Sequence, residues 1–185
     1  MPLYAKLPDR VKPSELTMIN PVWIDIQSNP KEFVPHKSVT FLWVMRGDGN
    51  VILGVEEPWR YKEAFDKSVW PMLEKMKQHY EAEAEYWKTQ SIRDGSGGHP
   101  TLAAWFDPTG RASDHAGFAY IGGELRYDEN TSQWVLTNQS GRFGRGSELK
   151  EGTVQEQDVL EALNGAAQRI TEKTGLAVTI RLVKK

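Results

Sequence analysis

Residues 38–55 read SVTFLWVMRGDGNVILGV and predict an antiparallel β-hairpin. Ser38 to Met45 is rich in β-branched and aromatic residues, and Val51 to Val55 is a second apolar run. The connection between the two runs, Arg46 to Asn50, contains glycines, as hairpin loops of this length commonly do. We therefore expect two neighbouring strands joined by a tight loop.

A second hairpin is predicted near the middle of the chain. Gly117 to Tyr127 forms the outgoing strand, residues 128–132 are a polar turn, and Gln133 to Asn138 is the returning strand. Gly122 and Gly123 interrupt the outgoing strand, which predicts either a β-bulge or a close approach of another backbone segment.

One predicted helical region lies between the two hairpins, and another follows the second hairpin. The first begins near Pro58 and carries apolar residues at spacings of three and four as far as Trp87, with Pro71 inside it, which predicts a kink or two consecutive helices. The second opens with a capping box at residues 153–156 and closes at Gly175. Residues 176–183 then form a closing strand that is apolar on both faces, which favours an interior position in the sheet.

These elements predict an α+β fold in which a mainly antiparallel sheet is packed by helices. Residues 22–185 form the single domain, and the proline-rich residues 1–21 form an arm that lies on it. Residues 22–27 alternate apolar and polar like a half-buried strand, and residues 101–106 predict a short strand or a helical turn. Regular alternation of strands and helices is absent, and so is any Walker loop or dinucleotide fingerprint.

Composition excludes several classes of function. The net charge of −2 over 185 residues provides no broad basic surface for nucleic acid or an anionic membrane. The chain has no cysteine, which excludes disulfides, thiolate zinc sites and a cysteine nucleophile. The four histidines show no metal-ligand spacing, so no metal site is predicted. The oligomeric state is left open.

The chain also lacks targeting signals of the common kinds. No Sec signal and no apolar run of about 20 residues are visible. We expect synthesis in the cytoplasm, and export by a specialised secretion system is compatible with this sequence.

Two residues are candidates for catalysis. His99 follows a glycine loop, where it can act as a base or hold a substrate, and the alternative is a loop histidine bonded to a backbone carbonyl. Glu124 directly follows the glycine pair in an otherwise apolar strand. It is either a rim residue facing water or a carboxylate aimed into a cleft, where it can orient His99, act as a base or hold a ribose hydroxyl.

A third polar segment, residues 138–146, follows the returning strand of the second hairpin. It contains three glycines and, as candidates for binding an anion or substrate, Asn138, Ser140, Arg142, Phe143 and Arg145. Exposed backbone N–H groups and guanidinium groups suit a phosphate or a carboxylate. The alternative is a flexible surface loop with solvated charges, although an aromatic ring in a glycine loop usually packs or stacks on something.

These three segments together resemble a known family. Residues 98–102 (GHPTL), 122–125 (GGEL) and 138–143 (NQSGRF) are similar to the ordered core of a domain found in bacterial polymorphic toxins and effectors and in plant IQ-motif calmodulin-binding proteins. The family pattern is His-Ser-Ser-Phe/Leu, Ala-Gly-Glu and Asn-x-Ser-Gly-His-Tyr. The residues 39–56 also resemble the strand pair that precedes the family's histidine.

The chain departs from that pattern at several positions. Pro100 and Thr101 stand where the family has serines, Arg142 replaces the second histidine, and Phe143 replaces tyrosine. An arginine can bind charge but cannot serve as acid or base. The resemblance implies an effector-like role and a cleft formed by the three segments, with Thr101 among the residues that bind substrate.

The leading hypothesis is therefore a bacterial effector or toxin-type enzyme domain, a transferase or hydrolase acting on a nucleotide-like or phosphorylated substrate. Transfer from NAD or hydrolysis of NAD would fit this set of residues. The alternative is a non-enzymatic immunity or adaptor protein that binds a partner protein, using the acidic helical face from Glu74 to Glu85 together with Trp87 and Trp105.

Overall fold

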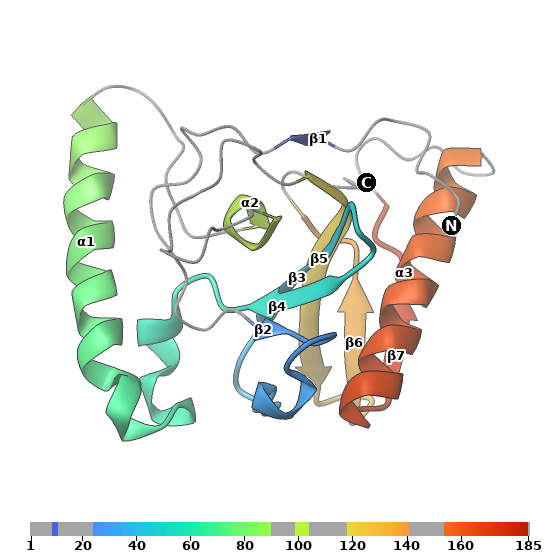
Figure 1. Cartoon of the computed structure of the whole chain (residues 1–185), viewed down its shortest axis with the longest axis horizontal. Helices are drawn as coiled ribbons and strands as arrows, with labels where there is room; N and C mark the ends of the chain where they lie inside the picture. The colour runs from blue at the N-terminus through green and yellow to red at the C-terminus, as the bar shows by residue number, and fades with distance from the viewer. Residues whose placement is uncertain (1–8, 11–23, 90–98, 104–117, 141–153, 185) are drawn as a thin grey trace.

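The computed structural model describes residues 9–10, 24–89, 99–103, 118–140 and 154–184, which form one α+β domain. Its centre is a sheet with strand order β2-β4-β3-β5-β6-β7, and β1 pairs with β5 beside this path (Figure 1). All neighbouring strands are antiparallel except β6 and β7, which are parallel. The bounds are β1 Asp9–Arg10, β2 Ile24–Asp25, β3 Phe41–Arg46, β4 Val51–Gly54, β5 Phe118–Asp128, β6 Gln133–Thr137 and β7 Val178–Arg181.

Both predicted hairpins are confirmed. β3 and β4 pair antiparallel, and Gly49 in their loop has a φ of 81°, a conformation that glycine adopts at little cost. The carboxylate of Asp48 accepts a hydrogen bond from the backbone N–H of Asn50 at 2.9 Å, which stabilises the turn. β5 and β6 form the second antiparallel pair.

The helices follow the sequence expectations with one refinement. The bounds are η2 Pro30–Glu32, η3 Pro58–Ala64, η4 Lys67–Val69, α1 Trp70–Thr89, α2 His99–Ala103 and α3 Val154–Thr174, where η marks a 3₁₀ helix. Pro71 is the second residue of α1, where its missing N–H costs nothing, so the region is made of consecutive helices. Gly175, with a φ of 74°, ends α3 as predicted.

The sheet lies between helices. α3 packs on one face and α2 on the other, while α1 contacts η3 and η4 (Figure 1). Strand alternation gives each face its own core, so that Phe41, Trp43 and Met45 point to the α3 face and Leu42 and Val44 to the α2 face.

The closing strand was predicted to be interior, and this prediction is wrong because β7 lies at the edge of the sheet. Its burial alternates. Val178 and Ile180 are half-buried, whereas Thr179 and Arg181 are exposed. Arg181 forms an ion pair with Asp128 at 2.8 Å, so the second face of this strand is polar and needs no further covering layer.

The remaining expectations concern short segments. Of the strand expected over residues 22–27, β2 covers Ile24 and Asp25, and the backbone N–H of Ile26 also donates to the carbonyl oxygen of Val51 in β4 at 3.3 Å. Residues 22–23 lie outside the described residues. Of the segment expected over residues 101–106 to be a short strand or a helical turn, residues 101–103 belong to helix α2 and residues 104–106 lie outside the described residues. Of the N-terminal arm, Asp9 and Arg10 are described, and they pair with β5. No helix in the described part of the chain is long and apolar enough to span a bilayer.

Candidate active site

The Gly122–Gly123 step of β5 is the point at which the candidate segments approach one another. The pair lies opposite Val44 and Trp43 in regular register, and the register shift of β5 falls elsewhere, at Met45/Arg46. A Cβ on Gly123 would lie 1.7 Å from the carbonyl oxygen of Thr137. Of the two readings of this glycine pair, the close backbone approach is therefore the one that the structure shows.

Each glycine admits a neighbour on a different face of the sheet. A Cβ on Gly122 would lie 3.1 Å from Cδ2 of His99, so the imidazole rests directly on this glycine. Successive residues of a strand point to opposite faces, so Thr137 and Asn138 approach Gly123 from the face opposite to His99. The three segments thus converge on one step of β5, but they do not all share one face.

His99 is the first residue of α2 and has a defined tautomer. Its Nε2 lies 2.9 Å from the carbonyl oxygen of Gly123. A carbonyl can only accept, so Nε2 carries the proton and Nδ1 carries the lone pair. Burial lowers the pKa of His99, although the hydrogen bond to Gly123 opposes this shift. The lowered pKa favours the neutral ring, and no described residue makes a hydrogen bond to Nδ1.

The position of His99 is fixed by the packing of α2. Leu102 and Ala103 are fully buried against the α2 face of the sheet. At the end of the helix, Nε of Arg46 donates to the carbonyl oxygen of Leu102 at 3.1 Å. Arg46 is only 4% exposed, and burial lowers its pKa while Asp48 and Asp25 raise it. Sequence reasoning assigned no role to this arginine, because its partner is a distant backbone carbonyl.

Glu124 lies on the same face of β5 as Gly122. Two strand residues separated by one other are roughly 7 Å apart, which sets the approximate spacing between Glu124 and the glycine under the His99 ring. Burial raises the pKa of Glu124, and Arg126 opposes the shift. The two causes of the His99 shift are burial and the Gly123 carbonyl, so Glu124 does not set the charge of the imidazole.

A second carboxyl group accompanies Glu124. Glu56 follows β4, and its pKa is raised by burial, then by the charges of Glu57 and Glu124. The side chain of Glu56 is nevertheless exposed at the surface. Sequence reasoning missed Glu56, although an acidic residue directly after a buried strand is a usable signal.

The same side of the molecule also receives a phenol from α1. Burial raises the pKa of Tyr80, and the charges of Glu57 and Glu56 raise it further. Its ring packs on Trp59, with centroids 5.1 Å apart, so η3 holds Tyr80 beside the carboxyl groups. Sequence analysis did not single out this tyrosine, because its apolar spacing on the helix indicated core packing.

Asn138 has a different environment from the one expected for a substrate-binding residue. Its side chain is fully buried. The amide oxygen accepts from the backbone N–H of Val183 at 2.7 Å, and the amide nitrogen donates to the carbonyl oxygen of Val183 at 3.2 Å. The side chain thus extends the pairing of β6 with the closing segment. Ser140 follows it, and its N–H donates to the carbonyl oxygen of Asn138 at 2.9 Å.

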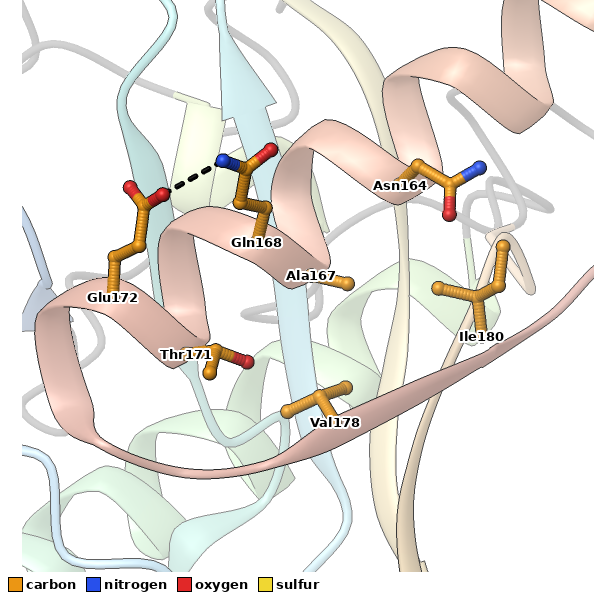
Figure 2. A pocket seen from close by; sticks show the side chains of 7 residues that line it. All are labelled: Asn164, Ala167, Gln168, Thr171, Glu172, Val178 and Ile180. Carbon is orange, nitrogen blue, oxygen red and sulfur yellow. Dashed lines mark hydrogen bonds between the residues drawn. The ribbon is translucent and has the colours of Figure 1, made fainter.

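The other predicted binding residues cannot be placed against the site. Arg142, Phe143 and Arg145 lie outside the described residues, and Thr101 is described only as part of the backbone of α2. Among the described residues, no group of three or more His, Asp or Glu side chains is arranged to hold a metal ion. A groove on the far side of the sheet, between α3 and β7, contains none of these residues (Figure 2).

This arrangement can perform acid–base chemistry. It places an imidazole of lowered pKa and a carboxyl group of raised pKa on one face of β5. Groups with perturbed pKa values gathered in this way are more frequent at catalytic sites than elsewhere. Comparisons with models of protein families, with curated proteins and with solved structures found no match for this chain.

Proposed function

We propose that this chain is a bacterial effector or toxin-type enzyme domain that acts on a nucleotide-like or phosphorylated substrate by acid–base catalysis. The observation that carries the proposal is the state of His99 beside Glu124. The lowered pKa of His99 favours the neutral imidazole, Nε2 donates to the carbonyl oxygen of Gly123, and Nδ1 would then accept a proton from the substrate.

In the proposed reaction, Nδ1 of His99 takes a proton from an attacking water or hydroxyl group. The raised pKa of Glu124 favours its protonated form, so this carboxyl group orients the substrate or supplies a proton to the leaving group. Ser140, Arg142 and Arg145 would hold the anionic part of the substrate. Transfer from NAD or hydrolysis of NAD fits these roles, because such a substrate combines ribose hydroxyls with phosphates.

The resemblance to toxin and effector domains supports the cellular role. Two residues of the segments that carry the resemblance, His99 and Asn138, lie against the Gly122–Gly123 step, which belongs to the remaining segment. The replacement of the family's second histidine by Arg142 leaves His99 as the imidazole of the site in this proposal.

The test is expression of the wild-type chain in a bacterium beside His99→Ala and Glu124→Gln. Growth arrest and loss of NAD, measured by chromatography of cell extracts, are expected with the wild type. Each substitution should lower the rate by roughly 10²–10⁴, the usual contribution of one acid or base group. Glu129→Gln, at an exposed residue of the β5–β6 turn, is the matched control and should behave as wild type.

The melting temperatures of all variants must be measured alongside. If both site variants remain folded and retain full toxicity and NAD consumption, the assignment of His99 and Glu124 fails. If the wild type is harmless and leaves nucleotide pools unchanged, the enzymatic proposal itself fails.

A second function, binding of a partner protein, is favoured by the surface of α1. Glu74, Glu81 and Glu85 are exposed along this helix, and the side chain of Met72 is 51% exposed. In that case His99→Ala should leave binding unchanged, and Glu74→Lys with Glu81→Lys should abolish a stoichiometric complex in pull-down from the native host. The side chain of Trp87 and all of Trp105 lie outside the described residues.

A further inference from the structure

A groove of about 390 Å³ runs between α3 and the edge strand β7. Figure 2 shows Ala167 of α3 on one side of the groove and Val178 and Ile180 of β7 on the other. Thr171 and Glu172 of α3 lie beside the end that holds Val178. The volume lies at the lower end of the roughly 300–1,000 Å³ found for ligand clefts. The groove is on the α3 face of the sheet, so it is separate from His99.

The sheet ends at this groove. β7 pairs with β6 through residues 178–181, and no other described strand pairs with it. In any strand, the backbone N–H and C=O groups of alternate residues point to opposite edges, so half of those in β7 are directed away from β6. A strand added there would continue the sheet and would direct every second side chain into the space above Val178 and Ile180.

The charges at the groove favour one kind of occupant. Glu172 is exposed at the end of the groove, and it accepts a hydrogen bond from Gln168 at 2.7 Å. It lies in the last turn of α3, where the helix dipole adds partial negative charge. Lys173 lies in the same turn but does not line the groove, so Glu172 is the charged side chain that faces an occupant there. A cationic side chain is therefore favoured at this end, and a phosphate is disfavoured.

We propose that β7 binds an extended segment of another protein as an added β-strand. Its alternate apolar side chains would occupy the groove over Ala167, Val178 and Ile180, and a lysine or arginine would lie beside Glu172. The inference does not depend on the proposed enzymatic activity, because it concerns residues on the opposite face of the sheet.

The test uses random linear peptides displayed on phage and selected against the full chain. The selected peptides should alternate apolar and other residues and should carry a lysine or arginine near one end. Their affinity is measured by fluorescence polarisation with synthetic, labelled copies. Methylating the backbone nitrogens of one alternate set of peptide residues should abolish binding, whereas methylating the other set should not, since an added strand uses one edge only.

Two variants of the protein locate the binding site. Glu172→Lys should weaken binding roughly three- to tenfold, because an exposed attraction is replaced by repulsion. Thr171→Trp should abolish it by filling the groove. Glu161→Lys, at another exposed position of α3 that does not line the groove, is the matched control and should bind as wild type.

Three results would overturn the proposal. The first is that selection yields no peptide whose binding exceeds background. The second is that Glu172→Lys and Thr171→Trp, shown to be folded by circular dichroism, bind the selected peptides as well as wild type. The third is a dimer in light scattering that Thr171→Trp converts to monomer, because the groove would then belong to a second copy of this chain.

Discussion

Replacing Gly123 by alanine should destabilise this protein far more than an ordinary substitution of glycine in a strand. The new Cβ would lie 1.7 Å from the carbonyl oxygen of Thr137, whereas real Cβ atoms essentially never approach within 3.0 Å of another heavy atom. The two backbone segments must therefore separate by at least about 1.3 Å. Backbone cannot be displaced as cheaply as the end of a side chain, so the strain falls on the sheet itself.

The separation also breaks a buried hydrogen bond. The indole N–H of Trp43 donates to the same Thr137 oxygen at 3.0 Å. A buried donor left without an acceptor costs about 1–3 kcal/mol, and overpacking of a tight site costs about 1–3 kcal/mol. We expect a loss of about 2–6 kcal/mol, a large part of the roughly 5–15 kcal/mol that stabilises a typical domain.

Urea denaturation followed by far-UV circular dichroism measures this loss. Gly165→Ala in α3 is the matched control, because a Cβ there meets nothing within 4 Å. Alanine is favoured over glycine inside a helix, so the control should gain up to about 1 kcal/mol. Stability of Gly123→Ala within about 0.5 kcal/mol of wild type would refute the reasoning, because surface changes without consequence lie in that range.

Three further predictions concern the site and the closing segment. Burial lowers the pKa of His99 below its value in the unfolded chain. The contribution of His99 to the free energy of unfolding is therefore complete above about pH 6.5, and it falls as the pH drops through the folded pKa. The urea midpoint of His99→Gln, measured between pH 5 and 8, should not show this fall at low pH. The raised pKa of Glu124 has the opposite sign. Relative to Glu124→Gln, wild type should lose a little stability as the pH rises above about 4.5, and equal pH profiles would contradict the shift. Asn138→Ala removes both bonds to Val183 and should cost about 1–3 kcal/mol in the same assay; an unchanged midpoint would show that the amide does not hold the closing segment.

The elements that local chemistry determines were predictable from the sequence. The hairpin turn at Gly49 and the end of α3 at Gly175 both depend on glycine with positive φ, and both occur where the sequence places them. The Gly122–Gly123 step was also predictable as a close approach, because two missing side chains in an apolar strand need a reason.

The order of the strands was not predictable in the same way. The position of β7 depends on which edge of the sheet remains after the two hairpins have paired, and apolar content alone misassigned it to the interior. The influence of Glu124 on Glu56 follows from the order β4-β3-β5, which brings residues far apart in the chain to one face.

The candidate site was predictable only in part. The position of His99 against Gly123 follows from two motifs that could be read from the sequence, although the tautomer could not. Asn138 looked like a binding residue because its polar neighbours suggested a loop. In the structure its side chain bonds to Val183, 45 residues away, and no local pattern indicates such a bond.

The parallel pairing of β6 with β7 has a consequence for how the domain is assembled. Antiparallel neighbours can form as soon as a hairpin is complete, but β7 can join only after α3 has carried the chain back to the other end of the sheet. During synthesis, the row of backbone groups along Trp134 to Leu136 therefore stays open until residues 178–181 have been made. Until then this edge can pair with a strand of another chain, and the finished molecule conceals it.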